Sequence, residues 1–248
     1  MTAAAIRFPL IRKIVLSPYL DVFGSFLILG VTLYKGFHQT IYFQGEIQFG
    51  IPVNELWSHF MQGAYPLGVL STIGAVFSLL SARLIGKQNN VGNGIGIATT
   101  VNSGVNDFLF GNLSAVITYP FSFFLNAFAT LNWTKGITLR ERDGYYYLIN
   151  LGGLLLGYLL VYLGFKLFED SWDMILFHSI GITFGLSLGA NLCTALKYRE
   201  TWLSWIIYNF FNLVKNIVLG NIANVVKYVF YLFNSIVTLT DWKVNGDR

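Results

Sequence analysis

A stripe of aromatic and amide side chains runs along the segment from residue 202 to residue 216. If this segment is helical, the residues on the shared face are Trp202, Trp205, Asn209, Asn212 and Asn216. At about 100° per residue, these spacings fall within a sector of about 80°. Exposing amides to lipid is costly, so the stripe must face other helices or a wet cavity. Indole rings beside amide donors and acceptors suit a small, flat, polar ligand.

The composition indicates that the elements positioning this stripe cross a membrane. Of the 248 residues, 54% are hydrophobic and only 11% are charged, and the mean hydropathy is +0.57. Soluble domains carry about 25% charged residues, so we expect an all-α polytopic membrane protein embedded in a lipid bilayer. We assign the net charge of +4 to loops and tails, where it reports topology and not affinity for nucleic acid.

Residues that catalyse reactions or bind metals are not arranged in recognisable motifs. Cys193 is the only cysteine, which excludes an intramolecular disulfide and a cysteine-based metal site. The three histidines lack zinc-binding spacing, and the chain has neither a P-loop nor an evident nucleophile–base pair. The sequence therefore predicts no metal, no cofactor and no enzymatic activity.

Apolar runs of about 18 to 22 residues predict eight membrane spans. They are 19–37, 66–85, 91–109, 113–132, 147–167, 174–196, 201–219 and 222–241, so the stripe lies on the seventh. Residues 5–16 are basic and amphipathic, and we expect them on the membrane surface, not as a cleaved signal peptide. The long loop at 38–65 is expected to hold a short interfacial helix near Val53 to Met61.

The basic residues are divided unevenly between the two sides that these spans define. Twelve of the 16 Lys and Arg residues fall on the side that holds both termini, which predicts cytoplasmic termini. Asp107 and the other acidic residues near the spans are placed at span ends, and His178 is the one titratable group placed deep. Coupled carriers usually have ionisable groups or ion ligands at depth. The pattern therefore favours uniport.

Two segments of the chain indicate an internal repeat. Residues 111–133 align with 220–242 without a gap, and seven of the 23 positions are identical. A shift of 110 pairs Asn102 with Asn212, so the stripe has a counterpart in the third span. We expect parallel triple-helix repeats in a 3+1+3 arrangement, with one extra N-terminal helix. The corresponding domains are 1–65 (surface helix, first span and external loop), 66–133 (first bundle), 134–173 (linker with span five) and 174–248 (second bundle and cytoplasmic tail).

The start of the seventh span resembles the signature of a transporter family. Residues 197–209 read KYRETWLSWIIYN, similar to the K-Y-x-E-N-W-x-x-W-x-x-x-N pattern of PnuC-type vitamin transporters, although Thr201 stands where the family often has Asn. The resemblance implies a SWEET-like duplicated triple-helix bundle in the bacterial inner membrane, which can assemble as a trimer. It also implies facilitated diffusion of nicotinamide riboside for NAD biosynthesis, with the substrate trapped when a cytoplasmic kinase phosphorylates it.

The proposed substrate-binding residues come from the stripe and from the walls that should oppose it. They are Trp202, Trp205, Asn209, Asn212, Asn102, Tyr119, Asn126, Tyr228, Tyr231 and Asn191. Tryptophan can stack on a pyridinium ring, and for Trp202, at the end of its span, an interfacial aromatic belt is the alternative. For Trp133 and Trp242, which also lie at span ends, we expect the belt. The amides can bind ribose or a carboxamide, or they can join neighbouring helices. Asn234 lies one residue off the opposing stripe.

Three functional alternatives and one mechanical question remain open at the level of sequence. Thiamine is also a flat cation, and riboflavin is a further ring substrate for the same fold. A non-transporting assembly or receptor subunit is a third reading. Pro120, inside the fourth span, is either a hinge or a static kink.

Overall fold

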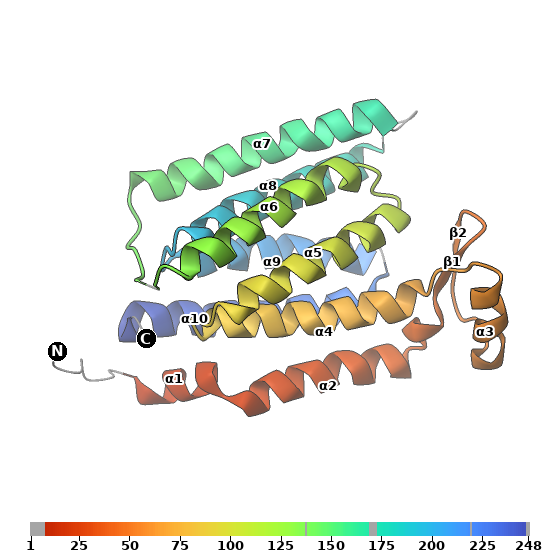
Figure 1. The fold of residues 1–248 in the computed structure, drawn as a ribbon, viewed down its shortest axis with the longest axis horizontal. Helices are drawn as coiled ribbons and strands as arrows, with labels where there is room; N and C mark the ends of the chain where they lie inside the picture. Colours follow the sequence, from red (N-terminus) through yellow and green to blue (C-terminus); the bar gives the residue numbers. More distant parts are fainter. Residues whose placement is uncertain (1–7, 137, 169–172, 219, 247–248) are drawn as a thin grey trace.

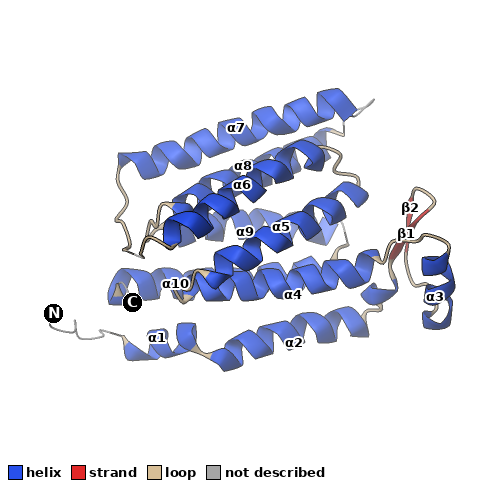
Figure 2. Ribbon diagram, in the orientation of Figure 1, coloured by secondary structure: helices blue, strands red, loops and turns tan. Residues whose placement is uncertain are grey.

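The computed structural model describes residues 8–246 apart from 137, 169–172 and 219, and these residues are mostly helical (Figure 2). The short helical elements are α1 (Pro9–Leu16), the 3-10 turn η1 (Phe37–Gln39) and α3 (Val53–Met61). The long helices are α2 (Pro18–Tyr34), α4 (Leu67–Gly86), α5 (Val91–Leu109), α6 (Ala115–Trp133), α7 (Gly144–Phe168), α8 (Met174–Ala195), α9 (Thr201–Val218) and α10 (Ile222–Asn245). An antiparallel hairpin pairs β1 (Ile41–Phe43) with β2 (Glu46–Gln48). Every predicted span coincides with a long helix.

Several of these helices are long and apolar enough to cross a membrane. Among the described residues they are α4, α7, α8 and α10, and the bent pair of α1 and α2 adds one more if it forms a single broken span. This pair bends by 49° at the point where Ser17 caps α2 through the backbone N–H of Leu20 and Pro18 begins the helix. The chain is therefore a multi-pass membrane protein, whereas the total of eight spans stays a prediction.

The long helices form two consecutive three-helix units. In the first unit α5 packs against both α4 and α6, and in the second α9 packs against both α8 and α10. Between the units, α6 packs on α8 and α10 packs on α4 (Figure 1). Outside them, α7 lies against α8 and α6, and α2 lies against α4 and α10. The space between the units is thus bounded by six helices.

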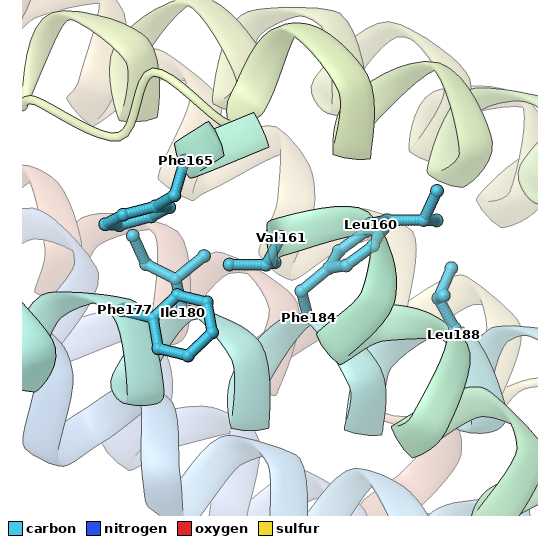
Figure 3. Packing of buried hydrophobic residues seen from close by; sticks show 7 residues of the cluster. All are labelled: Leu160, Val161, Phe165, Phe177, Ile180, Phe184 and Leu188. Atoms are coloured by element: carbon cyan, nitrogen blue, oxygen red, sulfur yellow. The ribbon is translucent and has the colours of Figure 1, made fainter. Parts of the chain in front are cut away.

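An apolar core joins the outer helix α7 to α8 (Figure 3). Its buried members are Leu160, Val161 and Phe165 from α7 and Phe177, Ile180, Phe184 and Leu188 from α8. Glycine lets the two backbones approach closely, because a Cβ at Gly157 would overlap the backbone of Gly185. A Cβ at Gly152 would meet nothing within 4 Å. Gly157 and Gly152, five positions apart on α7, therefore face very different surroundings.

The first and last helices meet at one end of the bundle. Arg12 on α1 forms an ion pair with Asp241 near the end of α10, with 2.9 Å between Nε and Oδ1. The hairpin and α3 lie at the opposite end (Figure 1). The short helix expected near Val53 to Met61 is confirmed as α3. The hairpin at 41–48 was not predicted.

Candidate functional site

A cavity of about 190 Å³ lies between the two three-helix units. Its wall is formed by side chains from α4, α5, α6, α8, α9 and α10. The ten residues proposed from the sequence all contribute to this wall: Trp202, Trp205, Asn209, Asn212, Asn102, Tyr119, Asn126, Tyr228, Tyr231 and Asn191. The structure thus brings the predicted stripe and its opposing walls around one space.

The helix α9 presents its polar face to the cavity and its apolar face outward. Trp202, Asn209 and Asn212 are 3%, 2% and 2% exposed, respectively. Ile207 and Phe210, on the other face, are exposed. This is the reverse of the pattern in a soluble amphipathic helix, and it suits a helix whose outer face contacts lipid.

One end of the cavity is aromatic. Trp202 packs edge-on against Trp242, with 5.5 Å between ring centroids, and Trp242 lies 6.5 Å from Trp133. Trp205 donates its indole N–H to Thr194 Oγ1 at 2.9 Å. The belt interpretation is wrong for Trp133 and Trp242, which are 2% and 0% exposed. Their indole N–H groups donate to the backbone oxygens of Thr194 and Gly86, which allows full burial.

The amides of the wall already make contacts within the protein. Asn102 donates to Leu70 O at 3.0 Å, and Asn126 donates to Thr100 Oγ1 at 2.8 Å, so these two amides do join neighbouring helices. Asn209 donates to Ser235 Oγ at 3.1 Å. Asn212 donates to the backbone oxygen of Tyr208, in its own helix. These four amides therefore have a fixed place in the wall before any ligand arrives.

Several polar atoms buried in this wall have no hydrogen-bond partner among the described residues. They are Trp202 Nε1, Asn209 Oδ1, Asn234 Nδ2 and Asn106 Oδ1. Burying such groups without partners is costly. They are two donors and two acceptors, and a ligand that carries both kinds of group would satisfy them. Asn234, which the sequence places one residue off the opposing stripe, therefore contributes one of these two buried donors of the wall.

The other end of the cavity is charged. Lys215 Nζ lies 3.4 Å from Asp107 Oδ2, which also accepts a hydrogen bond from Tyr119 OH at 2.9 Å. Lys227 is 5% exposed, and its ammonium lies 4.6 Å from the ring centre of Tyr228. Assigning the net charge to loops and tails was therefore wrong for Lys215 and Lys227, because both lie in helices and line the cavity.

The structure also corrects the sequence-based view of His178 and Tyr208. His178, placed deep in a span, is exposed in the second turn of α8 and does not line the cavity. Tyr208 was not among the proposed residues, yet it lines the cavity and bonds to Tyr228 with 3.3 Å between hydroxyl oxygens. Tyr208 lies one turn before Asn212, on the flank of the stripe, and this spacing was the available signal.

The first half of the signature stretch has an architectural role. Tyr198 is fully buried and donates to Asp143 Oδ1 at 2.9 Å. Burial and this hydrogen bond raise the pKa of Tyr198 to about 12, so the phenol remains a donor at neutral pH. Tyr146 OH donates to the backbone oxygen of Glu200 at 3.0 Å. These contacts fasten the start of α7 to the turn between α8 and α9.

Comparisons with known proteins agree with this architecture. The family model described as nicotinamide mononucleotide transporter matches residues 68–244. Among solved structures, one entitled "Crystal structure of the Vitamin B3 transporter PnuC" is similar, with a TM-score of 0.64 and 16% sequence identity. The similarity covers 93% of this chain and 92% of that one, and at this identity it shows a shared fold. No curated protein sequence gives a significant match.

Proposed function

The chain belongs to the nicotinamide mononucleotide transporter family, and from this premise we propose that it carries nicotinamide riboside across the membrane by facilitated diffusion. The family consists of transporters and not enzymes. The observation that supports the proposal most is the cavity between the two units, with tryptophans at one end and, in its wall, amide atoms that have no hydrogen-bond partner among the described residues. Thiamine and riboflavin are the alternative substrates, and a non-transporting subunit is the alternative role.

We propose that the two units are parallel repeats, arranged as 3+1+3 with α7 as the linker. Equivalent contacts support this arrangement. Asn126 bonds to Thr100 between α6 and α5, and Asn209 bonds to Ser235 between α9 and α10. A pseudo-twofold axis along the membrane normal would relate the units and pass through the cavity. The proposed domain boundaries remain 1–65, 66–133, 134–173 and 174–248.

The ten wall residues are proposed to bind the substrate with a division of roles. Trp202 and Trp205 would contact the pyridinium ring, and a cation–π contact with tryptophan contributes about 0.5 to 2 kcal/mol. The amides and tyrosines would bind the ribose hydroxyls and the carboxamide. The unpartnered indole N–H of Trp202 and carbonyl oxygen of Asn209 provide a donor and an acceptor at the aromatic end.

Uniport remains the proposed mechanism. Asp107 is the one carboxylate in the cavity wall among the described residues, and its oxygen already contacts Lys215 and Tyr119. Direction would come from phosphorylation of the riboside by a cytoplasmic kinase. We further propose a bacterial inner-membrane location with both termini in the cytoplasm, and assembly as a trimer.

Counterflow in liposomes tests the substrate and the mechanism together. Vesicles preloaded with unlabelled nicotinamide riboside are expected to accumulate the labelled compound, and external thiamine or riboflavin should compete weakly. A protonophore should leave the initial rate unchanged, because no proton is proposed to move with the substrate. Strong inhibition by the protonophore would refute uniport, and absence of counterflow with all three vitamins would favour the non-transporting role.

Replacing Lys227 with glutamine should improve binding of the cationic riboside. Thr238 and the Trp202 ring both lie close to Gly86. Thr238 comes eleven positions after Lys227 in α10, which corresponds to about 16 Å along the helix. Two like charges at this distance repel by about 1 kcal/mol at an effective dielectric constant of about 20. Affinity for nicotinamide riboside is therefore expected to rise about fivefold in a titration.

Two controls separate a charge effect from a packing effect at this position. The reduced riboside is uncharged, and its affinity should not change in Lys227→Gln. Lys243→Gln removes an exposed ammonium from the same helix and should alter neither affinity. Equal changes for both ribosides in Lys227→Gln would mean that Lys227 affects packing and not the charge of the cavity.

A further inference from the structure

A buried arginine outside the cavity holds one of the amides in its wall. Arg83 on α4 is 1% exposed, and its Nη1 donates to Asn234 Oδ1 at 2.9 Å. The same guanidinium donates from Nε to Asp21 Oδ1 at 2.6 Å and from Nη2 to Val15 O at 2.7 Å. Arg83 therefore connects the break between α1 and α2 to a side chain on α10.

This contact determines which way the Asn234 amide points. A guanidinium only donates hydrogen bonds, so the atom that faces it must be the amide oxygen, and the nitrogen lies on the other side. Asn234 is 1% exposed and contributes to the cavity wall, and its Nδ2 has no partner among the described residues. Asn209 differs, because the Ser235 hydroxyl that it faces can either donate or accept.

We propose that Arg83 is a positioning residue that holds Asn234 as an obligatory donor toward a hydrogen-bond acceptor of the substrate. The proposal rests on the proposed function, in which the strongest acceptor of the ring is the carboxamide oxygen. A buried donor without a partner gains more from such a contact than an exposed one does. The extra N-terminal helix thereby acquires a role, because Asp21 on α2 balances the buried charge of Arg83.

A pair of ligands isolates this hydrogen bond. The ribosides of 3-acetylpyridine and 3-ethylpyridine have similar shapes and the same ring charge, but only the first carries a carbonyl oxygen. Wild-type protein in detergent is expected to bind the acetyl compound about tenfold more tightly. Asn234→Asp keeps an oxygen toward Arg83 but replaces the donor with a second acceptor. This variant should lose or reverse the preference, and the carboxylate–guanidinium contact should preserve folding.

Two substitutions at the Asp21 cluster test the role of Arg83. Arg83 and Lys87 both pair with Asp21, but only Arg83 reaches Asn234. Arg83→Lys supplies a point charge that cannot replace the guanidinium fork, and the acetyl-to-ethyl ratio should fall to about two. Lys87→Met should keep the wild-type ratio.

The possible outcomes distinguish this proposal from the proposed function. A tenfold preference retained in Asn234→Asp, or an equal loss in Lys87→Met and Arg83→Lys, would overturn it. If Arg83→Lys fails to fold, Asn234→Asp still decides the question. Wild-type protein that binds nicotinamide riboside without an acetyl preference contradicts this inference alone, whereas wild-type protein that binds none of the ribosides contradicts the proposed function.

Discussion

Replacing Trp205 with alanine is expected to weaken nicotinamide riboside binding by about ten- to a hundredfold. The indole lines the cavity and is held by its hydrogen bond to Thr194, so its ring is fixed before the ligand binds. The loss combines the cation–π contact with the apolar area that the ring covers, in total about 1.4 to 2.8 kcal/mol. Isothermal titration calorimetry on the purified variant measures the change in dissociation constant.

The matched control removes a tryptophan far from the cavity. Trp57 on α3 is 72% exposed, and Trp57→Ala should bind the riboside as tightly as the unmodified chain. Trp205 is a better target than Trp202, because Trp202 is packed against Trp242 and its removal would also disturb the core. Unchanged affinity in a well-folded Trp205→Ala variant would remove the aromatic end from the proposed binding site.

Gly157→Val is expected to prevent stable folding. A Cβ at this position would overlap the backbone of Gly185, and the two helices would have to separate along the core that Figure 3 shows. Overpacking usually costs about 1 to 3 kcal/mol, and a clash between two backbones leaves less room for relaxation. We therefore expect a loss of about 3 kcal/mol or more, seen as poor expression or a lower unfolding temperature in detergent.

A neighbouring glycine supplies the control for that variant. Gly152 lies on the same helix, and a side chain there would meet no atom within 4 Å. Gly152→Val should therefore leave the unfolding temperature within a few degrees of the unmodified protein. If Gly157→Val and Gly152→Val are equally stable, the contact between Gly157 and Gly185 is not needed for the packing of α7 on α8.

The helices and the stripe were predictable because they depend on local sequence. Hydropathy locates the long apolar segments, and the spacing of Trp202, Asn209 and Asn212 follows the turn of a helix whatever surrounds it. Packing the polar faces inward then brings the proposed residues to one cavity. The element positions and the composition of the cavity wall thus follow from short-range patterns.

The features that the sequence did not reveal depend on contacts between distant segments. From its position at a span end, Trp242 is expected at the membrane interface. Its burial depends on the backbone oxygen of Gly86, which accepts the indole N–H and belongs to a distant segment. Lys227 looks like a charge at a span end, although its ammonium lies over the Tyr228 ring inside the bundle. The ion pair between Asp21 and Arg83 joins residues 62 positions apart. No periodicity in a single segment signals such partners.

The indole hydrogen bonds at the aromatic end restrict how the two units can move. Trp133 and Trp242 each reach the first helix of the other unit, at Thr194 O and Gly86 O, both at 2.9 Å. Pulling the units apart at this end would break both bonds, whereas tilting them about this point need break neither. The two indoles are therefore placed where the units could pivot against each other. With about 20 Å of α9 between Trp202 and Lys215, a tilt of about 10° would move the charged end by about 3 Å, enough to part Asp107 from Lys215.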